Sequence, residues 1–168
     1  VFMNAGAYGG EMKDIVEEVT VVKKDGSGVS VLSAEDMDFS YRHSILEKTG
    51  DIAVSAVLKL ESGDHEQIAL KMSELTRRRN EKQPVQYPSC GSFFKRPEGY
   101  FAGKLIQDAG LKGLTVGGAQ VSELHSGFII NRGGASASDI IDLMHLVQNV
   151  VYDKFGVKLE PEVRIIGD

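Results

Sequence analysis

The chain has 168 residues, 42% of them hydrophobic and 26% charged, which is typical of a folded protein of one ordinary or two small domains rather than a disordered one. Its net charge of −5 argues against nucleic acid as a general partner, and no apolar run approaches the roughly 20 residues that cross a bilayer. The single cysteine cannot form an internal disulfide and fits a reducing compartment, so we expect a cytoplasmic protein with no membrane partner.

The N-terminal third predicts strands and tight turns. No helix or strand leads into "VFMNAGAYGG", so we expect the first twenty-odd residues to be the tail of a preceding domain. The alternating "EEVTVVKK" (17–24) predicts a strand, "DGSG" (25–28) a hairpin turn and "VSVLS" (29–33) the returning strand. The β-branched, apolar segment 51–61 predicts another strand.

Residues 62–82 predict an amphipathic helix that ends in a basic tail. Asp64 and Gln67 form a capping-box pattern at its start. The apolar positions share one helix face: Ile68, Met72 and Leu75.

The C-terminal half predicts two more helices and two strands. Residues 100–110 predict a short helix ended by a glycine, 128–134 a short strand, and 158–167 a final strand whose Pro161 suggests a sheet edge or the beginning of the strand. Residues 136–156 are the clearest helix, with a capping box of Ser136 and Asp139 and a closing Gly156. Its apolar stripe is Ile140, Met144, Val147 and Val151. Strands and helices interleave without strict alternation, which predicts an α+β fold of two or three layers.

The segment "PSCGSFFKRP" (88–97) places a thiol, a hydroxyl and two cations close together. Considered alone, Cys90 is expected to pack as a small hydrophobe and Ser92 to serve as a turn residue, since "CGSFF" lacks the G-x-S-x-G pattern of hydrolases. The cations of "FFKRP" and "RRRNEK" are either solvated or suited to a diphosphate or carboxylate. Arg42 and Glu162 would most often form ion pairs, and no spacing resembles a metal site.

The succession of motifs is more specific than any one of them. "NAGAYGGE", "YRHSI", "KQPVQYPSCGSFFKRP", "FAGKLIQDAGLKG", "VGGAQVS", "GFIIN" and "LEPEVRIIG" together resemble the UDP-N-acetylenolpyruvoylglucosamine reductase family, the flavoenzymes of bacterial peptidoglycan precursor synthesis. The resemblance covers essentially the whole chain, with the blocks in the expected order.

The resemblance implies a reaction in two halves. NADPH reduces FAD, and the flavin then passes hydride to the enolpyruvyl ether of UDP-N-acetylglucosamine enolpyruvate, giving UDP-N-acetylmuramate. Most of the family's FAD-binding region has no counterpart in this sequence, so we expect the chain to be inactive alone. The implied domains are a remnant of the FAD-binding domain (1–40), a substrate-binding domain (41–157) and a C-terminal strand that returns to the active site (158–168).

The resemblance also implies roles for individual residues. Ser92, in "GSFF", would donate the proton to the α-carbon, and Arg42, in "YR", would stabilise the substrate carboxylate with help from Glu162, in "EV". The implied cofactor-binding residues are Asn4, Gly6, Ala7, Tyr8, Gly9 and Arg164. The implied substrate-binding residues are Lys82, Tyr87, Gly91 and Arg96, the last of which stands where some relatives have Asn.

Two other functions remain open at this point. A non-catalytic module that binds UDP-sugars would not require Arg42, Ser92 and Glu162 together. A flavin enzyme with a different substrate would lack the "QP…GSFF" block. The space between Glu61 and Gln83 leaves no room for a long inserted loop, which favours the shorter form of the family.

Overall fold

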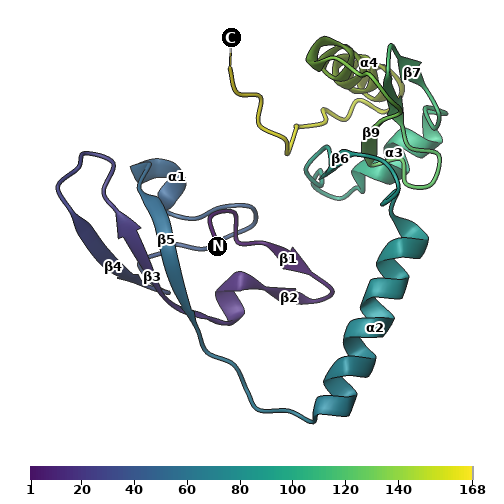
Figure 1. Cartoon of the computed structure of the whole chain (residues 1–168). Coiled ribbons are helices and arrows are strands. Elements are labelled where there is room, and N and C mark those ends of the chain that lie inside the picture. Colours follow the sequence, from purple (N-terminus) through teal and green to yellow (C-terminus); the bar gives the residue numbers. More distant parts are fainter. Residues whose placement is uncertain (168) are drawn as a thin grey trace. The chain divides into compact units, whose positions relative to one another are not determined.

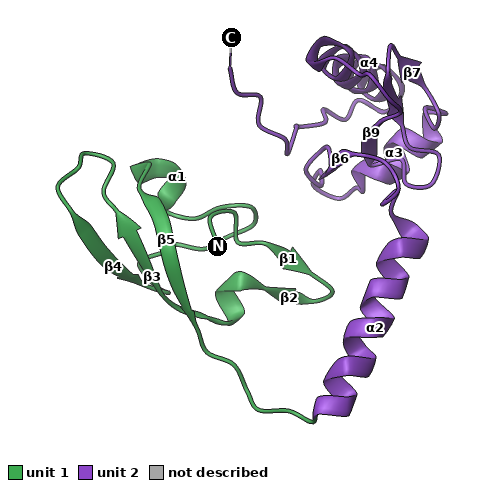
Figure 2. Cartoon of the chain, viewed as in Figure 1, with its two compact units in different colours: residues 1–64 green, residues 65–168 purple. Residues whose placement is uncertain are grey.

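The structure, a computed structural model, describes residues 1–167 and combines short antiparallel sheets with helices (Figure 1). The α+β fold predicted from the sequence is therefore confirmed. The chain divides into two compact units, residues 1–64 and residues 65–168 (Figure 2).

The first unit is built on a three-stranded antiparallel sheet. Its central strand is β3 (Val16–Val22), paired with β4 (Val29–Ser33) on one side and β5 (Ile52–Leu58) on the other. The predicted hairpin is confirmed, and a hydrogen bond from the Lys23 N–H to the Gly28 carbonyl (2.9 Å) closes its turn. One face of the sheet is covered: Val19 and Val21 are fully buried with Met37 and with Leu46 of α1 (Leu46–Thr49).

The expected domain boundary between residues 40 and 41 does not coincide with this division. Residues 41–64 belong to the first unit because β5 pairs along β3. Strand pairing across 30 or more residues of sequence is a tertiary interaction, and no local motif at residue 40 reports it.

The second unit begins with helix α2 (His65–Lys82), which confirms the predicted helix. The predicted apolar stripe is not buried, however: Ile68 is 48% and Met72 64% exposed, and Leu75 is only half-buried. In α2, which the structure describes from end to end, no residue is buried. Helical spacing identifies side chains that share a face, whereas burial requires a partner for that face.

The rest of the second unit is a small sheet covered by helices. In sheet order the strands are β6 (Ser89–Ser92), β9 (Phe128–Asn131), β8 (Ala119–Val121) and β7 (Thr115–Val116), all antiparallel. Helix α4 (Ala137–Phe155) contacts β7, β8 and α3 (Ala102–Asp108). The buried side chains of this core come from the sheet and both helices, including Phe93, Ile106, Val121, Ile129, Leu143 and Val147.

Helix α4 has the predicted ends and face. The Ser136 hydroxyl accepts from the Asp139 N–H (3.1 Å), the Asp139 carboxylate accepts from the Ser136 N–H (2.9 Å), and Gly156 closes the helix at φ 68°. Met144, Val147 and Val151 are buried and Ile140 is partly buried, as the apolar stripe predicted. Neither α4 nor any other helix within residues 1–167 has the length and hydropathy of a membrane span.

The C-terminal segment differs from the predicted strand over 158–167. It pairs at one bridge, between Phe94 and Pro161, and residues 162–167 then continue without a helix or strand; residue 168 lies outside the described residues. The bridge continues the outer strand β6, so Pro161 lies at a sheet edge, which is one of the two positions that the sequence left open. The proline is tolerated there because its neighbours make the hydrogen bonds: the Glu160 carbonyl accepts one and the Glu162 N–H donates the other.

Candidate active site

The glycine-rich N-terminal segment folds into a tight hairpin in the first unit. β1 (Gly6–Ala7) pairs antiparallel with β2 (Gly10–Glu11), and Tyr8 and Gly9 form the turn between them. Their φ angles of 52° and 90° are the pair of positive values that a type I′ turn requires. Glycine therefore takes one of the two turn positions without strain, and tyrosine holds the other in a conformation uncommon for a side-chain-bearing residue.

Asn4 fastens this hairpin to a second turn. Its side chain is buried, and its Nδ2 donates to Glu11 Oε2 (2.7 Å) and to the Ser40 carbonyl (3.1 Å). Its Oδ1 accepts from the Lys13 N–H (2.9 Å). The Asn4 amide therefore has a structural role, because its nitrogen and its oxygen both form hydrogen bonds within the protein.

Arg42 lies in the turn that Asn4 reaches. Ser40 and His43 exchange two backbone hydrogen bonds of 3.2 Å, and Arg42 between them adopts a φ of 54°. Its guanidinium lies 5.0 Å from the centre of the Tyr41 ring. A positive φ at a residue other than glycine is a strained conformation that clusters at functional sites.

One cavity joins the hairpin to Arg42. It measures about 320 Å³ and is lined by Asn4, Gly6, Ala7, Tyr8, Gly9, Gly10, Glu11, Tyr41 and Arg42. We call it the loop cavity. Five of the six residues predicted to bind the cofactor therefore line the same space as the arginine predicted to be catalytic.

Ser92 lies in the second unit, at the end of the outer strand β6. It pairs with Phe128 of β9, and the pairing is irregular between Ser89 and Ser92, where Gly91 has a φ of 81°. Ser92 is exposed, whereas the next residues, Phe93 and Phe94, are buried. A bulged strand anchored by buried rings directs the neighbouring hydroxyl to the surface.

The C-terminal segment brings Glu162 to the same strand. The Glu162 N–H donates to the Phe93 carbonyl (2.9 Å), one residue after Ser92. The structure thus places Ser92 and Glu162, 70 positions apart in the sequence, on adjoining backbones. Arg164 follows two residues later and is exposed.

A second cavity, of about 340 Å³, lies beside β6. It is lined by Arg79, Gln83, Pro84, Val85, Tyr87, Pro88, Ser89, Gly91 and Phe128, and we call it the strand cavity. Of the predicted substrate-binding residues it contains Tyr87 and Gly91. The Tyr87 hydroxyl accepts a hydrogen bond from the Arg132 guanidinium (2.7 Å), which also lies 4.7 Å from the ring centre.

The other predicted substrate-binding residues do not line that cavity. Lys82 is the last residue of α2 and is exposed. The Arg96 guanidinium lies 4.0 Å from the centre of the Phe101 ring, and its Nε donates to the Tyr100 carbonyl (3.4 Å). The expectation that Cys90 packs is wrong: Cys90 is exposed, because β6 is the outer strand of its sheet and is bulged there.

Sequence patterns did not identify three residues that lie in or beside the strand cavity. Arg79 belongs to the basic run "RRRNEK", where spacing did not distinguish it from its solvated neighbours. Gln83 lies in the "QP" motif. Arg132 carried no local signal, because its contact with Tyr87 crosses 45 positions of sequence.

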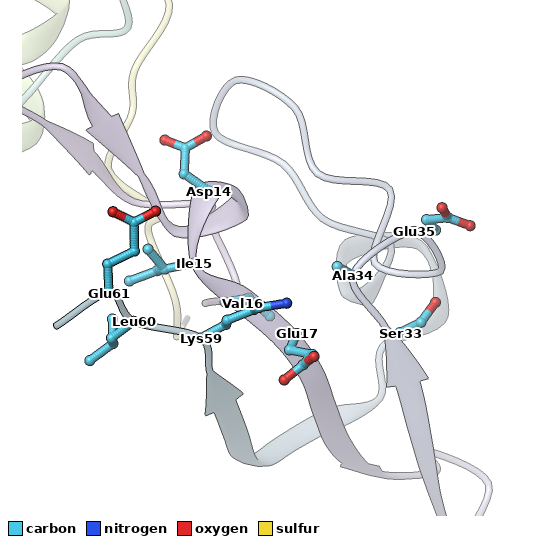
Figure 3. Close-up of a pocket in the computed structure, with 10 residues that line it drawn as sticks. All are labelled: Asp14, Ile15, Val16, Glu17, Ser33, Ala34, Glu35, Lys59, Leu60 and Glu61. Atoms are coloured by element: carbon cyan, nitrogen blue, oxygen red, sulfur yellow. The ribbon is translucent and has the colours of Figure 1, made fainter.

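A third cavity, larger than the loop cavity and the strand cavity, lies elsewhere in the first unit (Figure 3). It measures about 760 Å³ and contains none of the predicted site residues. Its lining carries four carboxylates, from Asp14, Glu17, Glu35 and Glu61, and one lysine, Lys59. This lining would repel an anionic ligand such as a nucleotide sugar, and within residues 1–167 no group of three or more potential metal ligands gathers.

Comparison with known proteins gives one consistent result. Residues 83–166 match the family model of the UDP-N-acetylenolpyruvoylglucosamine reductase C-terminal domain. The UDP-N-acetylenolpyruvoylglucosamine reductase of Caldanaerobacter subterraneus is 55% identical over all 168 residues of the chain, and that of Limosilactobacillus fermentum is 56% identical over 167 residues, or 99% of the chain. The matched region is 55% of each relative, so the chain spans little more than half their length.

A solved structure agrees with the sequence relatives. The crystal structure of UDP-N-acetylenolpyruvylglucosamine reductase from Thermus caldophilus matches this chain with a TM-score of 0.81 and 40% sequence identity. The match covers 96% of this chain and 57% of the Thermus caldophilus chain. The sequence and fold comparisons therefore point to the same family.

Proposed function

Because this chain belongs to the UDP-N-acetylenolpyruvoylglucosamine reductase family, we propose that it forms part of an enzyme that reduces UDP-N-acetylglucosamine enolpyruvate to UDP-N-acetylmuramate. The reaction would use NADPH and FAD and would take place in the cytoplasm, as a step of peptidoglycan precursor synthesis. The chain spans about 55% of its relatives, so the activity is proposed for the protein that contains it.

The loop cavity has the character of one edge of a flavin site. Four of its nine lining residues are glycine or alanine, and at these positions a planar ring system could approach the backbone closely. Its volume of about 320 Å³ is at the lower limit of pockets for ligands of drug size, so it would hold part of a dinucleotide only. The remaining contacts would come from the region that the relatives have and this chain does not. When bound, reduced FAD would supply the hydride that adds to the β-carbon of the enolpyruvyl group.

Ser92 is proposed to supply the matching proton. Hydride addition leaves an electron pair on the α-carbon, and the Ser92 hydroxyl donates its proton there to complete the new C–H bond. The exposed position of Ser92 allows its oxygen to recover a proton from solvent. A serine hydroxyl is a weak acid, but an enolate-like carbon is a strong enough base to take its proton.

Arg42 and Glu162 are proposed to act on the charge that develops in the substrate. The Arg42 guanidinium is permanently charged and its planar fork matches a carboxylate, so it would stabilise the negative charge spread over the substrate carboxylate. Glu162 would assist by donating a hydrogen bond or by holding the arginine. The strained backbone of Arg42 supports a functional role, because such strain persists where the surrounding structure maintains it.

The strand cavity is proposed to bind the nucleotide-sugar part of the substrate. Tyr87 offers a ring and Gly91 an open backbone, and Arg79 adds a cation suited to a diphosphate. Lys82 and Arg96 would contribute further positive charge, and Arg164 would contact the cofactor. Arg132 would hold the Tyr87 ring in place through its hydrogen bond.

The observation that carries this proposal is the pairing of the Glu162 segment with the backbone next to Ser92. It is tested in a fusion that places the N-terminal portion of the Caldanaerobacter subterraneus reductase ahead of Val1. We expect the fusion to bind FAD and to form product from NADPH and substrate. In the fusion, Ser92→Ala should lower the rate of product formation by about 10²–10⁴-fold while NADPH still reduces the flavin at the normal rate.

Ser138→Ala is the matched control, since Ser138 is an exposed serine of α4 that lines neither the loop cavity nor the strand cavity, and it should change the rate little. Normal product formation by Ser92→Ala would remove Ser92 from the proton transfer. Tight binding of UDP-sugar by the fusion without any turnover would instead favour the non-catalytic binding module.

A further inference from the structure

The loop that joins β8 to β9, residues 122–127, carries a partly buried histidine, His125. The Gly127 N–H donates a hydrogen bond to His125 Nδ1 (3.1 Å). A backbone N–H can only donate, so Nδ1 carries no proton and the imidazole is neutral, with its proton on Nε2. The side chain thus fixes the peptide two residues further along the chain, as an Asx-turn does.

The imidazole and its loop are packed against their neighbours. The imidazole lies edge-to-face against the Phe128 ring, with ring centres 4.8 Å apart. It also lies over Gly127, where a Cβ would come within 3.0 Å of His125 Cε1. The buried Ser126 hydroxyl donates to the Gly103 carbonyl of α3 (2.7 Å), which anchors the loop to the helix.

The same loop holds the backbone that carries Ser92. The Gly127 carbonyl accepts from the Phe93 N–H (2.8 Å), one residue after Ser92. Phe128 is the residue that pairs with Ser92 across β6 and β9. His125 therefore reaches the Ser92 backbone by two routes, one through the Gly127 peptide and one through the Phe128 ring.

The irregular pairing of β6 makes this support important. Between Ser89 and Ser92 the register with β9 shifts, and Gly91 has a φ of 81°. A bulge interrupts the ladder of hydrogen bonds that would otherwise hold the strand. The direction of the Ser92 side chain consequently depends on the bonds that follow it, of which the one from the Phe93 N–H to the loop comes first.

The surroundings of the imidazole favour the protonation state that its hydrogen bond requires. Burial lowers the pKa of His125 below its ordinary value of 6.5, and the positive charge of Lys112 lowers it further. The residues that contact the ring, Gly103, Gly127 and Phe128, have no titratable side chain. Protonation of Nδ1 would remove the acceptor and bring two N–H groups face to face.

We propose that His125 is a positioning residue for the proton transfer: its unprotonated Nδ1 fixes the Gly127 peptide, and this peptide holds the backbone that directs the Ser92 hydroxyl. The proposal rests on the role proposed above for Ser92. His125 lines neither the loop cavity nor the strand cavity, so it acts through the backbone and not on the substrate.

The fusion with the Caldanaerobacter subterraneus N-terminal portion tests this role in the reoxidation of reduced flavin by substrate. His125→Leu keeps an apolar side chain but offers no acceptor, and it should slow this step about 10- to 100-fold while NADPH reduces the flavin at the normal rate. His125→Asn should retain most of the rate, because Asn131 Oδ1 makes the equivalent bond to the Gly133 N–H (2.8 Å). His145→Leu, at an exposed position of α4, is the matched control and should leave the rate unchanged.

Two readouts distinguish positioning from a general loss of structure. Gly127→Ala leaves the histidine in place but adds a Cβ that displaces its ring, and it should slow the reoxidation as much as His125→Leu does. Between pH 8 and pH 5, the rate of the unchanged fusion should fall relative to that of His125→Asn, since only the histidine loses its acceptor on protonation.

Amide hydrogen exchange in the chain alone tests the link without any catalysis. The Phe93 N–H should exchange about tenfold faster in His125→Leu than in the unchanged chain, because the peptide that accepts its bond is no longer fixed. The Lys95 N–H, which donates to the Glu160 carbonyl (2.8 Å), should exchange at the same rate in both.

Each outcome decides one point. Equal rates for His125→Leu and His145→Leu, with Ser92→Ala slow, would overturn the positioning role and leave that of Ser92 in place. Normal product formation by Ser92→Ala would remove both roles. The same pH dependence in His125→Asn and the unchanged fusion, or an unchanged Phe93 exchange rate, would exclude the Gly127 hydrogen bond as the link. A fusion with the Limosilactobacillus fermentum N-terminal portion repeats the test if the first does not fold.

Discussion

Gly118 lies where two backbone segments meet so closely that a side chain has no room. A Cβ on Gly118 would lie 2.4 Å from the Ala135 N and 2.7 Å from the Ala135 Cα. Backbone atoms cannot move aside as the end of a long side chain can. The "VGGA" motif is therefore explained by the close packing of the β7–β8 turn against the start of α4.

We expect Gly118→Ala to lower the free energy of unfolding by about 1–3 kcal/mol, the usual cost of overpacking. Gly10→Ala is the control, because a Cβ there meets nothing within 4 Å. Urea denaturation of the full chain, followed by circular dichroism, measures both. Equal midpoints for the two variants would contradict the steric explanation.

At the scale of elements, the N-terminus of α4 combines a cap with a tertiary contact. The Asp139 carboxylate accepts from the Ser136 N–H and, at 3.3 Å, from the Gly118 N–H. These two backbone donors hold the pKa of Asp139 below its ordinary value of 3.8, because both favour the charged carboxylate. One side chain thus caps the helix and fastens it to the β7–β8 turn.

This lowered pKa predicts how stability depends on pH. A group whose pKa is lower in the folded state stabilises the protein above its unfolded pKa and loses that contribution as pH falls through the folded pKa. Asp139→Asn should therefore destabilise the chain at pH 6, and the difference in melting temperature from the unchanged protein should shrink as the pH falls below 3.8. A difference that stays constant from pH 6 to pH 3 would exclude this source of stability.

At the scale of the whole molecule, the two units differ in how completely they bury their apolar residues. The second unit has a core drawn from its sheet, α3, α4 and the C-terminal segment, where Leu159 is fully buried. The first unit covers only one face of its sheet. The second unit therefore has the buried hydrophobic core that independent folding requires, whereas the core of the first unit is less complete.

A chain of residues 62–168 is thus expected to fold by itself. It should show a cooperative thermal transition and the helical circular dichroism of α2 and α4. A matched chain that stops at Gly156 should melt at a lower temperature, because it lacks Leu159 and the bridge at Pro161. If residues 62–168 gave no cooperative transition, the second unit would depend on the first for its stability.

Interactions between residues close together in the sequence determined most of the helices, strands and turns of this protein. The "DGSG" turn, the capping box of Ser136 and Asp139 and the closing Gly156 were predicted from the sequence, because each depends on residues within a few positions of one another. The order of the motifs likewise identified the family, which the comparisons then showed. The roles of Arg42, Ser92 and Glu162 remain predictions.

Tertiary structure alone decided the features that depend on distant partners. The apolar spacing of α2 did not reveal that Ile68 and Met72 are exposed, and the outer strand position of β6 exposes Cys90. The pairing of the Glu162 segment next to Ser92 and the contact of Arg132 with Tyr87 each join positions at least 45 residues apart. Sequence patterns report which side chains share a face, but which surface meets that face is decided only when the chain has folded.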